Sequence, residues 1–186
     1  ALAGVSMSAD ALARHQVEMV PELPRLDDED YAGVLLLASP MGSGKTQRIG
    51  RPFADWAKHQ DARFVATCHR QSLVAELAHR LACDHYQDTP IEQAWAVQAF
   101  ATCLPSLVKD AHAQVIDEAG FVFVDEIAQV LRSVAAKVTV ADKKTRADVF
   151  HALRDLVSRA HCIIGADAGM DDRVLSFLES CRPGER

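Results

Sequence analysis

The chain has 186 residues, of which 49% are hydrophobic and 25% charged, and its net charge is −6. These values are typical of a single globular domain, and they argue against a disordered tail, a collagen-like repeat and a strongly basic nucleic-acid module. We expect a cytoplasmic protein with reduced thiols, because the cysteines lack a Cys-x-x-Cys spacing, residues 1–30 lack a signal-peptide pattern, and no apolar run approaches the roughly 18 residues of a membrane span.

The N-terminal stretch differs in pattern from the rest of the chain. Residues 1–30 are interrupted by prolines and an acidic run, and we expect them to form an extension in which 11–20 can be helical. Beyond them, continuous apolar runs alternate with helical spacing. The predicted strands are 34–38, 63–67, 94–102, 121–124 and 161–165, and the predicted helices are 73–81, 127–134 and 149–160. This alternation predicts an α/β domain over 31–186, with a mostly parallel sheet and helices on both faces.

A glycine-rich loop, Ser-Pro-Met-Gly-Ser-Gly-Lys-Thr, follows the first predicted strand at 39–46. Glycines at its centre let the backbone come close to phosphate oxygens, and a lysine beside them can reach the β- and γ-phosphates of a nucleotide. A threonine hydroxyl at the end of the loop can bind Mg²⁺. We therefore predict that ATP and Mg²⁺ bind here. The predicted contacts are Pro40, Met41, Gly42, Ser43, Gly44, Lys45 and Thr46.

Two features near this loop depart from the simplest pattern. Ser39 stands where the general phosphate-loop pattern has a glycine. The segment after Lys45 keeps helical spacing, but Gly50 and Pro52 interrupt it, so we expect a kinked or broken helix there.

Two acidic pairs compete as the partner of the predicted metal. Asp117 and Glu118 end a helical stripe that begins near 107, so we expect a solvated helix end there. Asp125 and Glu126 instead follow a run of four apolar residues, which is typical of a buried strand that ends at a site. We therefore predict that Asp125 binds Mg²⁺ and that Glu126 is the catalytic base, acting with Lys45. The two carboxylates can also cap the helix that begins at Ile127, a function compatible with metal binding.

The order of these segments resembles the first RecA-like domain of superfamily 2 helicases, a P-loop NTPase fold. Among these, the chain is most similar to plasmid replication proteins related to the herpesvirus origin-binding helicase. The similar segments are 39–47 (motif I), 64–73 (motif Ia), 101–109 (a segment that ends Ser-Leu-Val-Lys), 124–131 (motif II) and 162–168 (motif III). In superfamily 2 the first glycine of motif I is commonly replaced by a small residue, so the resemblance also accounts for Ser39.

The resemblance implies an ATP-hydrolysing motor half that couples hydrolysis to single-stranded or origin DNA during replication. The DNA contacts it implies are Thr67, His69, Arg70 and Lys109, for which a solvated loop is the alternative. The coupling residues it implies are Gln129 and Asp167, and Asp167 can instead cap the helix that follows it. Superfamily 2 enzymes bind ATP between two RecA-like domains. Because this sequence holds one of them, we expect a separate C-terminal helicase domain as partner and little or no hydrolysis by this chain alone.

Two other functions remain open from the sequence. A P-loop kinase for a small substrate, similar to thymidine kinases, would use the same loop and an Asp-Glu strand end, but those enzymes carry paired cysteines for zinc. A nucleotide-dependent interaction module that hydrolyses nothing would not need Glu126 as a base.

Overall fold

The computed structural model describes residues 5–135 and 145–184 of the chain. Within them a six-stranded sheet forms the centre of the domain, and all of its strand pairs are parallel. The strands are β1 (Gly33–Ala38), β2 (Arg63–Cys68), β3 (Asp84–His85), β4 (Ala99–Cys103), β5 (Ala119–Asp125) and β6 (Cys162–Asp167). Their order in space is β1-β6-β5-β2-β4-β3. The fold class predicted from the alternating pattern is therefore confirmed.

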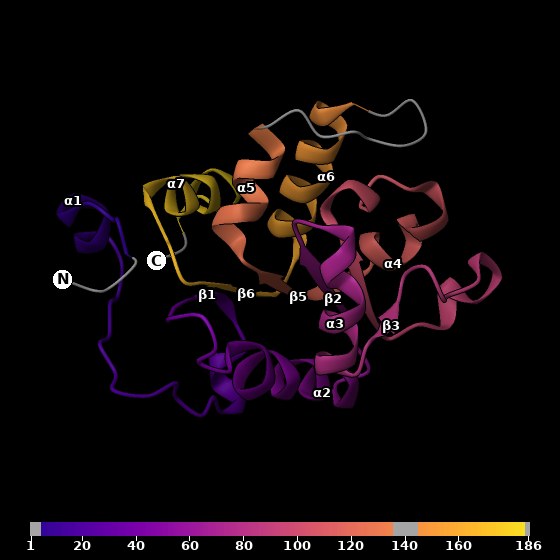
Figure 1. Ribbon diagram of the computed structural model, residues 1–186, viewed down its shortest axis with the longest axis horizontal. Coiled ribbons are helices and arrows are strands. Elements are labelled where there is room, and N and C mark those ends of the chain that lie inside the picture. Colours follow the sequence, from indigo (N-terminus) through magenta and orange to yellow (C-terminus); the bar gives the residue numbers. More distant parts are fainter. Residues whose placement is uncertain (1–4, 136–144, 185–186) are drawn as a thin grey trace.

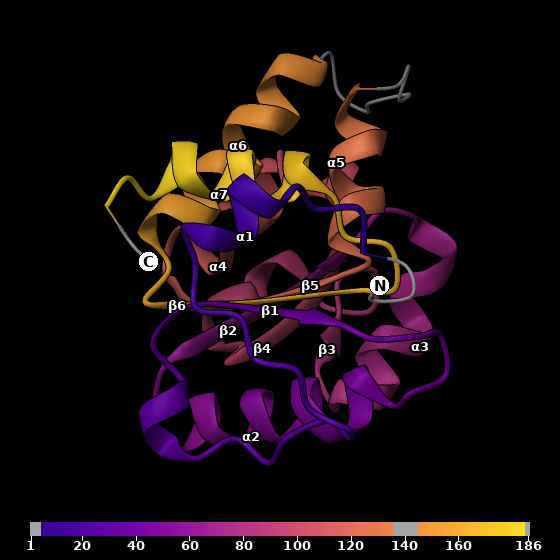
Figure 2. The same ribbon diagram turned by 90° about the vertical axis from the view of Figure 1, so that its left-hand side faces the viewer.

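Helices cover both faces of the sheet, as Figures 1 and 2 show. The helices are α1 (Ala9–Ala13), α2 (Arg51–His59), α3 (Gln71–Leu81), α4 (Ala113–Asp117), α5 (Ile127–Ala135), α6 (Arg146–Arg159) and α7 (Asp172–Cys181). Helices α2 and α3 lie on one face, and α4 to α7 lie on the other. Short 3-10 turns occur at Asp28–Asp30, Ile91–Ala96, Leu104–Ser106 and Asp110–His112. No helix in the described ranges is long and apolar enough to cross a membrane.

The helix after the glycine-rich loop begins as a π-helical turn, Thr46–Gly50, and runs into α2 with helical backbone throughout. A Cβ at Gly50 would lie 2.8 Å from Leu81 Cδ2 and 3.0 Å from the Phe123 ring, so glycine allows this close approach to the sheet. Pro52 lies in the first turn of α2, where a missing N–H costs little. The kink predicted here is therefore a change of helix type.

Two predicted elements differ from the structure. The strand predicted at 94–102 begins only at Ala99, because Ile91–Ala96 forms a 3-10 helix after Pro90. The helix predicted from about 107 is instead a series of short turns that ends in α4. A short apolar run can belong to a strand or to a buried helix, so its period alone does not decide between them.

The N-terminal extension, from residue 5 onward, packs against the domain. The Ser6 N–H donates to the Met170 carbonyl at 2.8 Å, and Arg14 and His15 both contact Glu179 on α7. Figures 1 and 2 show that the chain then passes around the β1 edge of the sheet toward α2. The helix predicted within 11–20 is shorter and earlier than expected, because α1 ends at Ala13.

Candidate functional site

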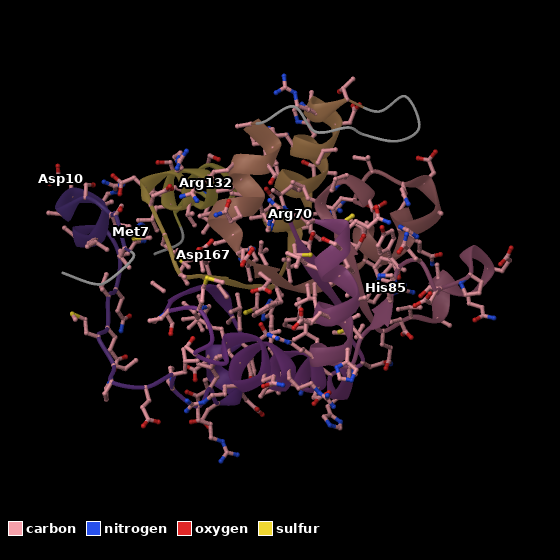
Figure 3. The ribbon with its side chains drawn as sticks, viewed as in Figure 1. Met7, Asp10, Arg70, His85, Arg132 and Asp167 are labelled. Carbon is pink, nitrogen blue, oxygen red and sulfur yellow. The ribbon has the colours of Figure 1, made fainter. Side chains whose placement is uncertain are left out.

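The carboxyl ends of β1, β6, β5 and β2 meet at one edge of the sheet. The register pairs Ala38 with Asp167 and Asp125 with Ala166, so these strands end at nearly the same level. Figure 3 labels Asp167 at the end of β6 and Arg70 just before α3, both at this edge. Ligands of open α/β sheets bind outside the carboxyl ends of the strands, so this edge is the candidate site.

The glycine-rich loop leaves β1 at this edge and folds back over its own lysine. Gly42 and Gly44 have φ values of +75° and +84°, a region that residues with a side chain rarely adopt. The Lys45 ammonium donates to the carbonyls of Ser39 at 2.6 Å and Pro40 at 2.9 Å. The loop is therefore closed on itself by contacts that a phosphate group could replace.

Other side chains of the loop differ in their exposure to solvent. The Ser43 hydroxyl is buried without a hydrogen-bond partner among the described residues, and Thr46 is buried at the start of the helical turn. A buried hydroxyl without a partner costs free energy, which a bound oxygen-rich ligand would relieve. Met41 is 81% exposed, and its predicted contact with a nucleotide stays a prediction.

Asp125 and Glu126 end β5 at the same edge. Burial, followed by repulsion from Glu126, raises the pKa of Asp125 to about 6, and attraction to Lys45 opposes this rise. Burial lowers the pKa of Lys45, whereas Asp125, Asp167 and Glu126 each act to raise it. Because β1, β6 and β5 are successive neighbours in the sheet and end at nearly the same level, the loop after β1 and the acidic ends of β5 and β6 lie at the same edge. The structure thus brings together the residues that the sequence predicted as the catalytic group.

The donor atoms at this edge fit Mg²⁺. Thr46 offers a hydroxyl and Asp125 a carboxylate, and hard oxygen ligands of this kind are those that Mg²⁺ prefers. Among residues 5–135 and 145–184, no three His, Cys, Asp or Glu side chains cluster as a metal cage.

The competing acidic pair lies at the opposite edge of the sheet. Asp117 is the last residue of α4, and its carboxylate lies 3.0 Å from the Arg159 guanidinium. Glu118 caps the same helix and lies 2.8 Å from Arg63. The whole length of β5 separates this pair from Asp125, so the interpretation of 117–118 as a helix end is confirmed.

Asp167 is buried and its carboxylate is fully engaged. One oxygen accepts the Ala128 N–H at 2.8 Å, and the other accepts the Gly169 N–H at 2.8 Å. The carboxylate therefore ties the end of β6 to the first turn of α5. It does not cap the helix that follows it, because Asp171 caps α7. Gln129, the other predicted coupling residue, has an exposed side chain on α5.

The predicted DNA contacts occupy different environments. Thr67 is fully buried in β2, so its side chain is not at the surface in this structure, and its predicted contact with DNA stays a prediction. Arg70 is exposed at the start of α3. The Lys109 ammonium lies 5.0 Å from the centre of the Tyr86 ring, after β4. His69 points to Glu126, with its Nδ1 atom 3.2 Å from Glu126 Oε2.

Arg48, which was not among the predicted site residues, makes three contacts beside the loop. The Arg48 N–H donates to the Gly44 carbonyl at 2.7 Å, and its guanidinium donates to the Leu23 carbonyl at 3.3 Å and lies 3.6 Å from Glu22. Arg48 lies about one helical turn beyond Lys45, so helical spacing alone could have predicted that it lies near the loop. Its contacts with the N-terminal extension span 25 residues and have no signal in the sequence.

Comparisons with known proteins identify the fold. No protein-family model matches the chain. An uncharacterised protein of Picosynechococcus sp. is 33% identical over 111 residues, which cover 58% of this chain but only 11% of that protein. Two solved structures have a similar fold. The Sulfolobus solfataricus SWI2/SNF2 ATPase core in complex with dsDNA has a TM-score of 0.55 and 16% identity, over 80% of this chain and 31% of that one. The helicase MrfA has a TM-score of 0.53 and 14% identity, over 83% and 27%. The domain therefore has the RecA-like α/β fold of ATPase and helicase cores.

Proposed function

We propose that this chain is the nucleotide-binding half of a DNA-stimulated ATPase of the helicase type, with ATP as its substrate and Mg²⁺ as its metal. One observation carries the proposal. Lys45 ends a loop with two left-handed glycines after β1, at the same edge of the sheet where β5 ends in Asp125 and β6 ends in Asp167. A cation and carboxylates at the carboxyl edge of a parallel sheet are the parts that phosphoryl transfer needs.

Each residue at this edge of the sheet has a proposed role that follows from its chemistry. The Lys45 ammonium would exchange the Ser39 and Pro40 carbonyls for phosphate oxygens. The Thr46 hydroxyl and the Asp125 carboxylate would hold Mg²⁺, which when bound neutralises charge on the phosphates. The Glu126 carboxylate would orient the attacking water and accept its proton.

DNA is the proposed effector. The exposed Arg70 guanidinium and the Lys109 ammonium follow β2 and β4 at the same edge, and phosphate groups bind such cations. The resemblance of 64–73 to motif Ia supports a single-stranded DNA backbone as the ligand, and the similarity to plasmid replication proteins supports a role in replication. A second RecA-like domain is the proposed partner that completes the ATP site.

The test is steady-state ATP hydrolysis by the complete protein that carries this sequence, with and without single-stranded DNA. We expect DNA to raise the rate, and we expect Lys45→Ala and Glu126→Gln to abolish it. Asp117→Asn is the matched control, because it alters an acidic residue at the opposite edge of the sheet and should leave the rate unchanged. Phosphorylation of a deoxynucleoside, with no response to DNA, would instead identify a kinase.

A further inference from the structure

The contact between His69 and Glu126 joins the proposed base to the segment proposed to bind DNA. His69 follows β2 and Glu126 follows β5, and these strands are neighbours, with Thr67 opposite Val124. The two side chains approach to 3.2 Å between Nδ1 and Oε2. Nδ1 is buried and makes no hydrogen bond with the described residues, so the 3.2 Å separation from Glu126 is a close contact and not a hydrogen bond.

The backbone of Glu126 is fixed while its side chain has room to move. Its φ is +53°, which is uncommon for a residue with a side chain. Its carbonyl accepts the N–H groups of Gln129 at 2.8 Å and Val130 at 2.9 Å, which anchors the residue to the first turn of α5. The side chain remains 38% exposed. The direction of its carboxylate therefore depends on side-chain torsions and on the groups that it meets.

The strand order places His69 and the phosphate-binding loop on opposite sides of Glu126. The phosphate-binding loop leaves β1, which lies on the β6 side of β5, whereas His69 leaves β2 on the other side. A contact with His69 therefore draws the Glu126 carboxylate away from the loop. Burial lowers the pKa of His69, which favours the neutral imidazole, and the Glu126 carboxylate opposes this shift. The contact is thus not a strong ion pair, and a modest displacement can break it.

We propose that His69 is a positioning residue that restrains Glu126 in the DNA-free protein, and that DNA bound at the adjacent Arg70 releases it. This inference rests on the proposed function and adds the means by which DNA would stimulate hydrolysis. Arg70 is exposed while His69 faces inward, so this short segment presents the Arg70 cation to DNA and the His69 imidazole to the Glu126 carboxylate. A shift of this segment on DNA binding would free the carboxylate to swing toward the nucleotide.

Kinetics provide the first part of the test. In the complete protein, His69→Ala should raise the rate of ATP hydrolysis without DNA by about three-fold or more and reduce the stimulation by DNA, with the KM for ATP unchanged. His69→Asn, which keeps a donor toward Glu126, should restore the low basal rate. His79→Ala is the control, because His79 is exposed on α3 and should behave as wild type. A lower basal rate in a folded His69→Ala protein would overturn the inference.

DNA binding without nucleotide provides a readout that needs no catalysis. If DNA must break the contact, His69→Ala and Glu126→Ala should each tighten binding of a labelled oligo-dT, and the double variant should bind no more tightly than either. Unchanged affinity in both single variants, or additive effects in the double variant, would overturn the inference. A wild-type protein that neither binds DNA nor hydrolyses ATP would contradict the proposed function itself, which separates the two failures.

Discussion

Replacing Asp125 with asparagine should stabilise the nucleotide-free domain at neutral pH, although it removes a residue of the candidate site. Burial, with repulsion from Glu126, raises the pKa of Asp125 from 3.8 to about 6. A difference of about two pKa units makes the ionised carboxylate less stable in the folded domain than in the unfolded chain by about 3 kcal/mol. Asparagine has a similar shape and no charge. Asp125→Asn should therefore raise the free energy of unfolding by about 1–3 kcal/mol, the lower figure allowing for imperfect hydrogen bonds of the amide.

The pH dependence identifies the cause of this gain. Because the folded protein binds the Asp125 proton more tightly than the unfolded chain does, the free energy of unfolding of the wild type falls as the pH rises from about 4 to above 6. The variant lacks this decline. Urea unfolding followed by circular dichroism, in EDTA, should give nearly equal stabilities below about pH 4 and the full difference at pH 7.5. Asp117→Asn, which removes an exposed partner of Arg159, should lose at most about 1 kcal/mol.

Either of two results would refute this reasoning. A less stable Asp125→Asn protein at pH 7.5 would mean that the carboxylate makes favourable contacts that outweigh its burial. A stability difference that does not change with pH would mean that its ionisation is not the cause. Adding ATP and Mg²⁺ should shift the difference by about 2.7 kcal/mol in favour of the wild type, because a ligand at about 100 times its Kd stabilises the wild type by that amount and the variant by little.

Two further substitutions test the packing that positions the site. Gly50→Ala should lower the free energy of unfolding by about 1–3 kcal/mol, because its Cβ would meet Leu81 at 2.8 Å, although alanine normally favours a helix. A Cβ at Gly120 would meet nothing within 4 Å, so Gly120→Ala should change the free energy of unfolding by less than about 0.5 kcal/mol. Equal effects of Gly50→Ala and Gly120→Ala in urea unfolding would contradict this explanation. Asp167→Ala should cost about 2–4 kcal/mol and speed hydrogen exchange of the Ala128 amide, measured by NMR, because it leaves two N–H groups without their acceptor. Unchanged exchange would show that the carboxylate does not hold α5.

Most of the sheet was predictable because strands buried on both faces are continuous apolar runs. The runs at 34–38, 63–67, 121–124 and 161–165 each coincide with a strand of the structure to within a few residues. The strand at Asp84–His85 has two residues and no apolar pattern, so nothing in the sequence indicated it. Gly50 was taken as a helix breaker, whereas its role is to let the helix approach the sheet, which depends on a packing partner distant in the chain.

The site was predictable where its chemistry is local. The glycine-rich loop and the acidic end of β5 are short continuous patterns, and their meeting at one edge follows from a parallel sheet. The contact of His69 with Glu126 was not predictable, because it requires β2 to lie beside β5, which is a property of the topology. Thr67 was assigned to DNA from its place in a motif, and it is buried because β2 is a central strand covered by helices on both faces.

The central claim is that Lys45 and the acidic strand ends form one site for ATP and Mg²⁺. The most direct measurement is the binding of a fluorescent ATP analogue to the chain, followed by fluorescence anisotropy with Mg²⁺ and with EDTA. Wild-type protein should bind the analogue in a Mg²⁺-dependent manner, and Lys45→Ala should weaken binding by about ten-fold or more, since it removes a charge-assisted contact with phosphate. Equal binding by wild type and Lys45→Ala, or no binding by a folded wild type, would contradict the claim.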